Sequence, residues 1–163
     1  STFRSISRTS VSSTSSHESP IIVNASFSAY PSSPIRVDSI EAVVWKSENG
    51  ADSLYFKVGF TNVGSGTVYV TAGCGSSLNS TITSGAEVVE MVSSVRCLCA
   101  EYMAPINASQ SHVSVDPGCW SGYGYVVRHP GSFSAVFTLF WSDSPQPANS
   151  PDHLTIIATF TVP

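Results

Sequence analysis

The sequence predicts an all-β fold, because large apolar residues recur at every second position and no capped helical stripe persists for three turns. The clearest run is residues 53–62, in which the inward-facing positions are Leu54, Phe56, Val58 and Phe60. Turn-forming residues such as Gly, Pro and Asn separate these runs at short intervals. Alternation with closely spaced turns is typical of a protein built from sheets.

The first predicted strand spans residues 21–30, with Asn24 on its polar, solvent-facing side. Its inward-facing residues are Ile21, Val23, Ala25, Phe27 and Ala29. The remaining strands are predicted at residues 39–46, 53–62, 66–72, 87–92, 95–102, 112–115, 122–128, 133–141 and 154–162. Turn signals lie at residues 48–50, 63–66, 130–131 and 144–147, and loops are expected at residues 76–85 and 104–111.

Nine to ten short strands favour an immunoglobulin-like Greek-key β-sandwich over a closed barrel. Trp45 and Trp141 lie in alternating strands and are expected to belong to the core. A chain of 163 residues with 42% hydrophobic content can bury one sizeable core. We therefore expect a single head domain, residues 20–163, preceded by an N-terminal tail, residues 1–19.

The composition argues against several classes of partner. Only 11% of the residues are charged, the net charge is -4, and Lys and Arg form no cluster, whereas nucleic acids and anionic membranes need concentrated positive charge. The apolar runs are far shorter than a membrane span. Because the chain starts at Ser rather than Met, we expect a processed, extracellular protein. The scarcity of charge also suits an acidic medium, in which carboxylates become protonated.

The tail contains twelve Ser or Thr residues and only three large apolar ones, Phe3, Ile6 and Val11. Such a segment buries too little apolar surface within itself to offset a backbone entropy cost of roughly 1–2 kcal/mol per residue. We therefore expect it to pair with a folded body, its own or a neighbour's. Residues 1–14 are the predicted donor strand, with Phe3, Ile6 and Val11 as anchors, and residues 15–19 are a linker. The alternative donor is residues 20–30, whose alternation is cleaner.

Four cysteines, Cys74, Cys97, Cys99 and Cys119, are predicted to form two disulfides. Extended residues two apart project from the same face, so Cys97 and Cys99 are expected to bond to other cysteines rather than to each other. We expect Cys74 to pair with one of them and Cys119 with the other. The spacing lacks the paired knuckles of a structural zinc site, so no metal is predicted.

Three glycosylation sequons begin at Asn24, Asn79 and Asn107. Together with the cysteines they are typical of an oxidising, extracellular setting. We expect N-linked glycans on at least one of these side chains and no other cofactor.

The layout of the whole chain resembles the subunit of the archaeal thread filament, a thin surface filament of acid-loving archaea. The resemblance is carried by the polar tail, the strand and turn at residues 56–66 (FKVGFTNVGSG), the cysteine-rich centre at residues 96–100 (RCLCA) and the sequons. In that family each subunit has an immunoglobulin-like head, and its N-terminal tail completes the sheet of the next subunit. The resemblance implies a glycosylated homopolymer of identical subunits on the cell surface, with contacts to surfaces or other cells through its glycans.

Two other classes of function are weaker. An enzyme would need a catalytic constellation, but the histidines are scattered, Ser121 lacks the flanking glycines of a nucleophile elbow, and the carboxylates follow no recognisable pattern. The residues concerned are His17, His112, His129, His153, Glu87, Glu90, Glu101 and Asp116. We predict no catalytic site. The stronger rival is a secreted or cell-surface carbohydrate-binding, adhesive module, because Trp120, Tyr123 and Tyr125 cluster and aromatic rings stack on sugars.

Overall fold

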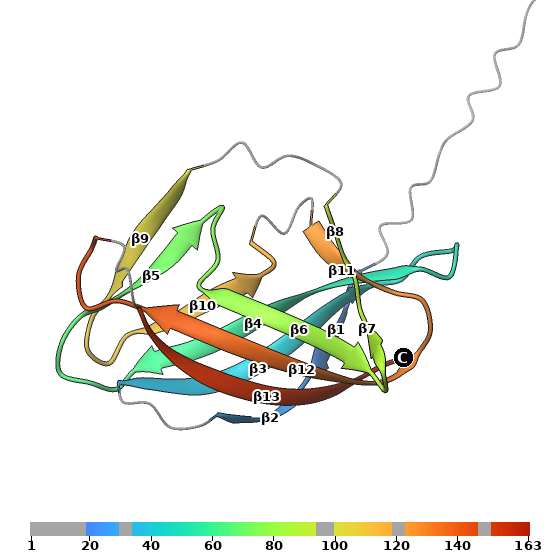
Figure 1. Ribbon diagram of the computed structural model, residues 1–163, viewed down its shortest axis with the longest axis horizontal. Coiled ribbons are helices and arrows are strands. Elements are labelled where there is room, and N and C mark those ends of the chain that lie inside the picture. The colour runs from blue at the N-terminus through green and yellow to red at the C-terminus, as the bar shows by residue number, and fades with distance from the viewer. Residues whose placement is uncertain (1–18, 30–33, 94–99, 119–122, 147–150) are drawn as a thin grey trace, which may run out of the picture.

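The computed structural model describes residues 19–29, 34–93, 100–118, 123–146 and 151–163, and every regular element in these ranges is a β-strand (Figure 1). The predicted all-β class is therefore confirmed. The strands are β1 (Ile21–Asn24), β2 (Ser26–Ala29), β3 (Ile35–Trp45), β4 (Asp52–Asn62), β5 (Val68–Gly73), β6 (Leu78–Ser84), β7 (Glu87–Val88), β8 (Met91–Ser93), β9 (Glu101–Ile106), β10 (Ser111–Asp116), β11 (Tyr123–Val127), β12 (Gly131–Trp141) and β13 (Asp152–Val162).

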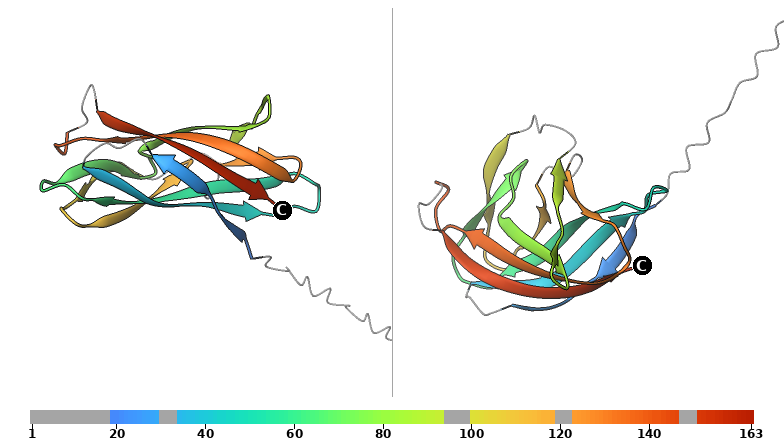
Figure 2. Two further views of the ribbon diagram at one scale, coloured as in Figure 1. Left: turned by 90° about the horizontal axis from the view of Figure 1, so that it is seen from below. Right: turned by 45° about the vertical axis from the view of Figure 1, so that its right-hand side comes forward.

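The strands form two larger antiparallel sheets and one small one. The first has the order β1-β3-β4-β11-β8, with β10 on the same side of β4 as β11 but paired with its second half. The second has the order β2-β13-β12-β6-β7. Figure 2 shows these two sheets as facing layers. The small sheet pairs β5 with β9, and Tyr69 of β5 bridges to Ser142 just after β12.

The core lies between the two larger sheets. Phe56 of β4 contacts Phe137 of β12 and Phe160 of β13, with ring centroids 5.0 and 5.3 Å away and near-perpendicular rings. The alternation that predicts β4 is observed directly, since Leu54, Phe56, Val58 and Phe60 are all at most 1% exposed. Every second residue of β12 and β13 is buried in the same way. The sandwich-like packing follows from these alternating apolar faces.

The first predicted strand is split in the structure. Residues 21–24 pair with β3 in one sheet, whereas residues 26–29 pair with β13 in the other. Ala25 lies at the crossing, and its amide donates to the Ile40 carbonyl oxygen at 2.9 Å. Val23, Ala25, Phe27 and Ala29 pack against the core as predicted, but Ile21 is 38% exposed because it begins a short edge strand.

Several other predictions are corrected. Residues 76–85, expected to be a loop, contain β6, which pairs with β12, and the expected loop at residues 104–111 begins within β9 and ends in β10. The single strand expected at residues 87–92 is two short strands, β7 and β8, in different sheets. Most of the strand predicted at residues 95–102 lies outside the described residues. Trp141 is buried as expected, whereas Trp45 is 41% exposed because β3 ends there on the outer face.

Candidate functional site

A sandwich has exposed strand edges, and the described edges of β3 and β9 carry features that discourage strand addition. On β3, residues 35–39 extend beyond β1, and there the register shifts between Val37 and Ser39 and Arg36 bonds Asp38 at 2.8 Å. The outer edge of β9 carries Glu101 and Pro105. Bulges, charges and proline are the usual means by which natural sheets protect an edge.

The outer edge of β10 lacks this protection. Among the described strands β10 pairs only with β4. The Ser76 hydroxyl donates to the Val115 carbonyl oxygen at 2.8 Å, so the backbone groups of Val115, and by alternation those of Ser111 and Val113, point away from β4. None of these three residues is charged or proline, and Val113 is 56% exposed. This edge can accept another strand.

A groove of about 240 Å³ runs beside this edge, between β10 and the small sheet. Burial changes steadily along the inner face of that sheet: Val70 is 1% exposed, Ala104 is partly buried, and Tyr102 is 59% exposed. The small sheet therefore leans away from the body, as Figure 1 shows for β5 and β9. The residues that line the groove are Thr71, Ala72, Gly73, Gly75, Ser76, Tyr102, His112, Val113, Ser114, Val115 and Gly118.

Two features hold the walls of this groove in place. At its narrow end, the buried Asn62 amide donates to the carbonyl oxygens of Ile106 (2.9 Å) and Gly66 (2.7 Å), which ties β9 and the turn before β5 to the end of β4. Further along, a Cβ on Gly118 would lie 2.8 Å from the Cys74 carbonyl oxygen, so only glycine allows these backbones to approach so closely. The opening is part of the fold rather than a gap between loops.

Ser114 is the chemically unusual residue of the groove. Ser114 is only 5% exposed, yet its hydroxyl forms no hydrogen bond within the described part of the chain. A buried hydroxyl without a partner costs about 1–3 kcal/mol. His112, on the same face of β10, is half-buried with its ring 5.5 Å from that of Phe60, and burial lowers the pKa of this imidazole. The β10 side of the groove is therefore uncharged at these two residues, and the Ser114 hydroxyl is unpaired but itself buried.

Next to the groove lies a buried polar cluster that is internally satisfied. Asp116, at the end of β10, accepts hydrogen bonds on Oδ2 from Ser80 (2.5 Å) and Tyr125 (2.8 Å), whose hydroxyls also contact each other. Burial raises the pKa of Asp116, an effect that these two hydrogen bonds partly oppose. Burial and the neighbouring Asp116 carboxylate also raise the pKa of Tyr125, so the phenol stays neutral and donates. The cluster joins β6 of one sheet to β10 and β11 of the other.

The three sequon asparagines are all exposed. Asn24 is in β1, Asn79 is in β6, and Asn107 is in the turn between β9 and β10. The side-chain oxygen of Asn107 accepts a hydrogen bond from the Thr67 hydroxyl at 3.0 Å. This bond does not involve the side-chain nitrogen, which is the atom to which a glycan is attached. Each site is thus positioned where a sugar would face solvent.

Other predicted site residues lie outside the described part of the chain. These are the anchors Phe3, Ile6 and Val11, the cysteines Cys97, Cys99 and Cys119, and also His17, Trp120 and Ser121. Cys74 is described, follows β5 and is disulfide-bonded. The pairing of the cysteines stays a prediction.

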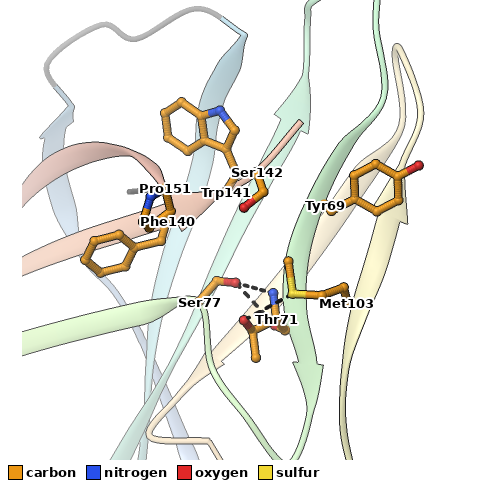
Figure 3. Close-up of a pocket in the computed structure, with 8 residues that line it drawn as sticks. All are labelled: Tyr69, Thr71, Ser77, Met103, Phe140, Trp141, Ser142 and Pro151. Atoms are coloured by element: carbon orange, nitrogen blue, oxygen red, sulfur yellow. Dashed lines mark hydrogen bonds between the residues drawn. The ribbon is translucent and has the colours of Figure 1, made fainter. Parts of the chain in front are cut away.

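The aromatic cluster proposed for sugar binding is not assembled by the described residues. Tyr125 is 5% exposed, and its ring packs against Phe56 in the core. A second pocket, of about 110 Å³, lies between β5 and the end of β12 (Figure 3). Its polar groups bond one another: the Thr71 amide donates to Ser77 Oγ at 2.6 Å, and the Thr71 hydroxyl donates to the Met103 sulfur. It therefore serves packing between β5, β9 and β12.

The candidate catalytic residues are dispersed. His112 lies in the groove, whereas His153 is on β13 and His129, in the turn after β11, is 3.5 Å from an exposed Glu87. Among the described residues, no three His, Cys, Asp or Glu side chains gather as a metal site would require. This arrangement assigns no catalytic role to any of them.

No helix in the described ranges is both long enough and apolar enough to cross a membrane. The chain matches no family model, no curated protein and no solved structure. The function must therefore be argued from the strand edges, the groove and the exposed sequons.

Proposed function

We propose that the protein is the structural subunit of an extracellular, cell-surface filament. Residues 1–14 of one copy add as a donor strand to the head of the next, and repetition of this contact gives a head-to-tail homopolymer. The head is a sandwich of immunoglobulin-like, Greek-key type, and glycans on Asn24, Asn79 and Asn107 cover the polymer and mediate contacts with surfaces or other cells. The layout is that of the archaeal thread filament.

The observation that carries this proposal is the uncovered edge of β10. A long-lived extracellular protein is expected to protect such an edge, because it can pair with any extended chain. A groove runs beside this edge, residues 111, 113 and 115 are neither charged nor proline, and the pairing of β10 with β4 has no register shift. Strand addition to an edge is a recognised mode of binding, in which main-chain hydrogen bonds supply affinity.

The pairing of residues 21–29 supports residues 1–14 as the donor segment. β1 and β2 already complete the edges of both larger sheets within their own chain. Donating residues 20–30 would strip these strands from β3 and β13 and expose the partly buried Val23 and Phe27. Donation of residues 1–14 instead leaves the pairings of β1 and β2 in place.

Deletion of residues 1–14 tests the proposal. We expect the truncated protein to form no filaments by negative-stain electron microscopy, whereas the full chain forms them under the same conditions. A full-length triple variant, with Phe3, Ile6 and Val11 each replaced by Ser, is the matched control for chain length, and its assembly should be weakened. Circular dichroism of each variant verifies that the head is folded. Filaments of normal length from the truncated protein would exclude tail donation.

A further inference from the structure

We propose that the acceptor of the donated tail is the groove between β10 and the small sheet, and that the tail of a second copy adds to the free edge of β10. This inference rests on the proposed function and identifies the partner surface within it. The occupant is the N-terminal segment of an identical chain.

The backbone of β10 offers the required hydrogen bonds. Its even-numbered residues bond to β4, while the amide and carbonyl of Val113, and those of Ser111, point toward the groove. The uncovered part of β3 has a bulge and the Arg36–Asp38 ion pair, and β9 has Pro105 on its edge. On the β13 edge, the Lys46 ammonium donates to the carbonyl oxygen of Pro163 at 2.7 Å. Of the edges compared, β10 is the one whose backbone groups at Ser111 and Val113 face the groove without a charge, proline or bulge, although its Val115 carbonyl oxygen already accepts from Ser76.

Ser114 gives an independent indication that something binds here. Its hydroxyl is buried on the groove wall and lacks a partner in the described part of the chain. A strand placed along β10 would bring side chains next to it, since cross-strand neighbours on one face lie about 4.5–5.5 Å apart at Cβ. The tail is rich in Ser and Thr, which can both donate to and accept from this hydroxyl.

The exit point of the tail favours a second copy over the same chain. Ile21 pairs with Val44 at the level of Leu54, and β1 runs from there toward the level of Lys57. Ile21, where β1 begins, therefore lies away from the groove, which is at the level of residues 57–60 and is separated from β1 by β3, β4 and β10. Eighteen extended residues span up to about 60 Å, enough to reach a neighbouring head.

The two surfaces also match in size and charge. The groove volume of 240 Å³ is below the range of roughly 300–1,000 Å³ that is usual for small-molecule sites, and suits side chains of an extended segment. Small Ser and Thr side chains allow a strand to lie close to the glycine-lined wall, and an apolar anchor can contact Ala72 and Tyr102 of the lining. The tail carries Arg4 and Arg8, and the Glu101 carboxyl lies over Gly75 at the groove. Tail and groove are therefore complementary.

Photo-cross-linking of the full chain tests the acceptor directly. Benzoylphenylalanine replaces Phe3, isotopically heavy and light copies are mixed, and cross-linked peptides are identified by mass spectrometry after assembly. Links between copies that fall within residues 101–118 are the expected result. Links between copies that fall elsewhere, for example on β3 or β13, would overturn this acceptor while leaving tail donation intact. Links only within one copy, or a failure of the unmodified full chain to assemble, would overturn the proposed function itself.

Two substitutions give a second test with matched controls. Val113→Pro removes an amide that points away from β4 and should abolish assembly with the head still folded, whereas Val113→Thr keeps the amide and should assemble normally. Ser114→Ala should leave the monomer as stable or more stable, yet raise the concentration needed for assembly roughly five- to tenfold. Normal assembly of a folded Val113→Pro protein would exclude the β10 edge. An unchanged assembly threshold for Ser114→Ala would remove the role of its hydroxyl.

Discussion

At the scale of single residues, Asp116 has the most distinctive environment. It is 4% exposed and accepts hydrogen bonds from Ser80 and Tyr125, and no Lys, Arg or His in the described part of the chain forms an ion pair with it. Asp52 is the opposite case. Burial alone would raise the pKa of Asp52. The hydrogen bonds from the Lys46 ammonium and the Ser47 amide, together with the positive charge of Lys46, lower this pKa overall. The two carboxyl groups therefore respond to acid in opposite directions.

We predict that Asp116 favours the folded state at acidic pH. Its folded pKa is raised above the ordinary value of 3.8, so between these two values the native protein keeps a proton that the unfolded chain has lost. Stability from this group is consequently present in acid and falls as pH rises through that window. Urea denaturation of the wild type and of Asp116→Asn, from pH 3 to pH 7, should show the wild-type advantage shrinking as pH rises.

Asp52→Asn is the matched control for that experiment. Because the folded pKa of Asp52 is lowered, its contribution is present above pH 3.8 and is lost as pH falls further. The advantage in unfolding free energy of the wild type over Asp52→Asn should therefore shrink as the pH falls.

For Asp116, stability curves of the wild type and Asp116→Asn that run parallel with pH would contradict the prediction, because they would mean that Asp116 has the same pKa in the folded and unfolded states.

At the scale of strands, the sequence predicts a strand well where one face is strictly apolar. β4, β12 and β13 lie within two residues of their predicted bounds, because burial of every second side chain dictates both strand and register. β6 escapes prediction since Asn79, Ser80, Thr81 and Thr83 resemble a loop in composition, and its burial depends on pairing with the distant β12. Alternation of apolar residues also does not indicate which sheet a strand joins. The sequence therefore does not predict that the chain passes from one sheet to the other at Ala25.

The candidate site is predictable only in part, for a related reason. The sequence locates the exposed sequons. Whether the outer edge of β10 is free, however, depends on which other strands pair with it in the folded chain. Ser114 shows the limit: it lies in the predicted strand at residues 112–115, yet nothing local indicates that its hydroxyl is buried without a partner. Such features arise from segments that are distant in the sequence, such as β5 and β10.

The contact of Phe56 with Phe137 and Phe160 couples the two larger sheets, and we predict that Phe56→Ala destabilises the head by about 3–5 kcal/mol. The loss combines reduced apolar burial with a cavity between the sheets. Tyr102→Ala, at a site that is 59% exposed, should cost far less and serves as the control. Denaturant titration followed by tryptophan fluorescence measures both. A loss below 1 kcal/mol for Phe56→Ala would show that the sheets repack around the gap.

At the scale of the whole molecule, the head combines an apolar core with a surface that has few charges. The charged fraction of 11% is well below the roughly 25% of typical soluble domains. Hydroxyl groups and the proposed glycans, whose state does not change with acid, then carry solubility. In the proposed polymer, main-chain hydrogen bonds between copies would supply most of the affinity.

Disulfide bonds are also expected to stabilise the head as a whole. A disulfide that closes the segment of roughly 23–25 residues after Cys74 is worth about 3 kcal/mol in the loop-entropy model. For a domain of this size, about 2–4 °C of melting temperature corresponds to each kcal/mol, so replacing Cys97 and Cys99 by Ser should lower the melting temperature by about 6–12 °C or more. Differential scanning calorimetry with and without a reducing agent provides the measurement. Reduction should lower the melting temperature of the wild type toward that of the double variant and leave the variant nearly unchanged. Equal melting temperatures of the two oxidised proteins would show that bonds to these cysteines do not stabilise the head.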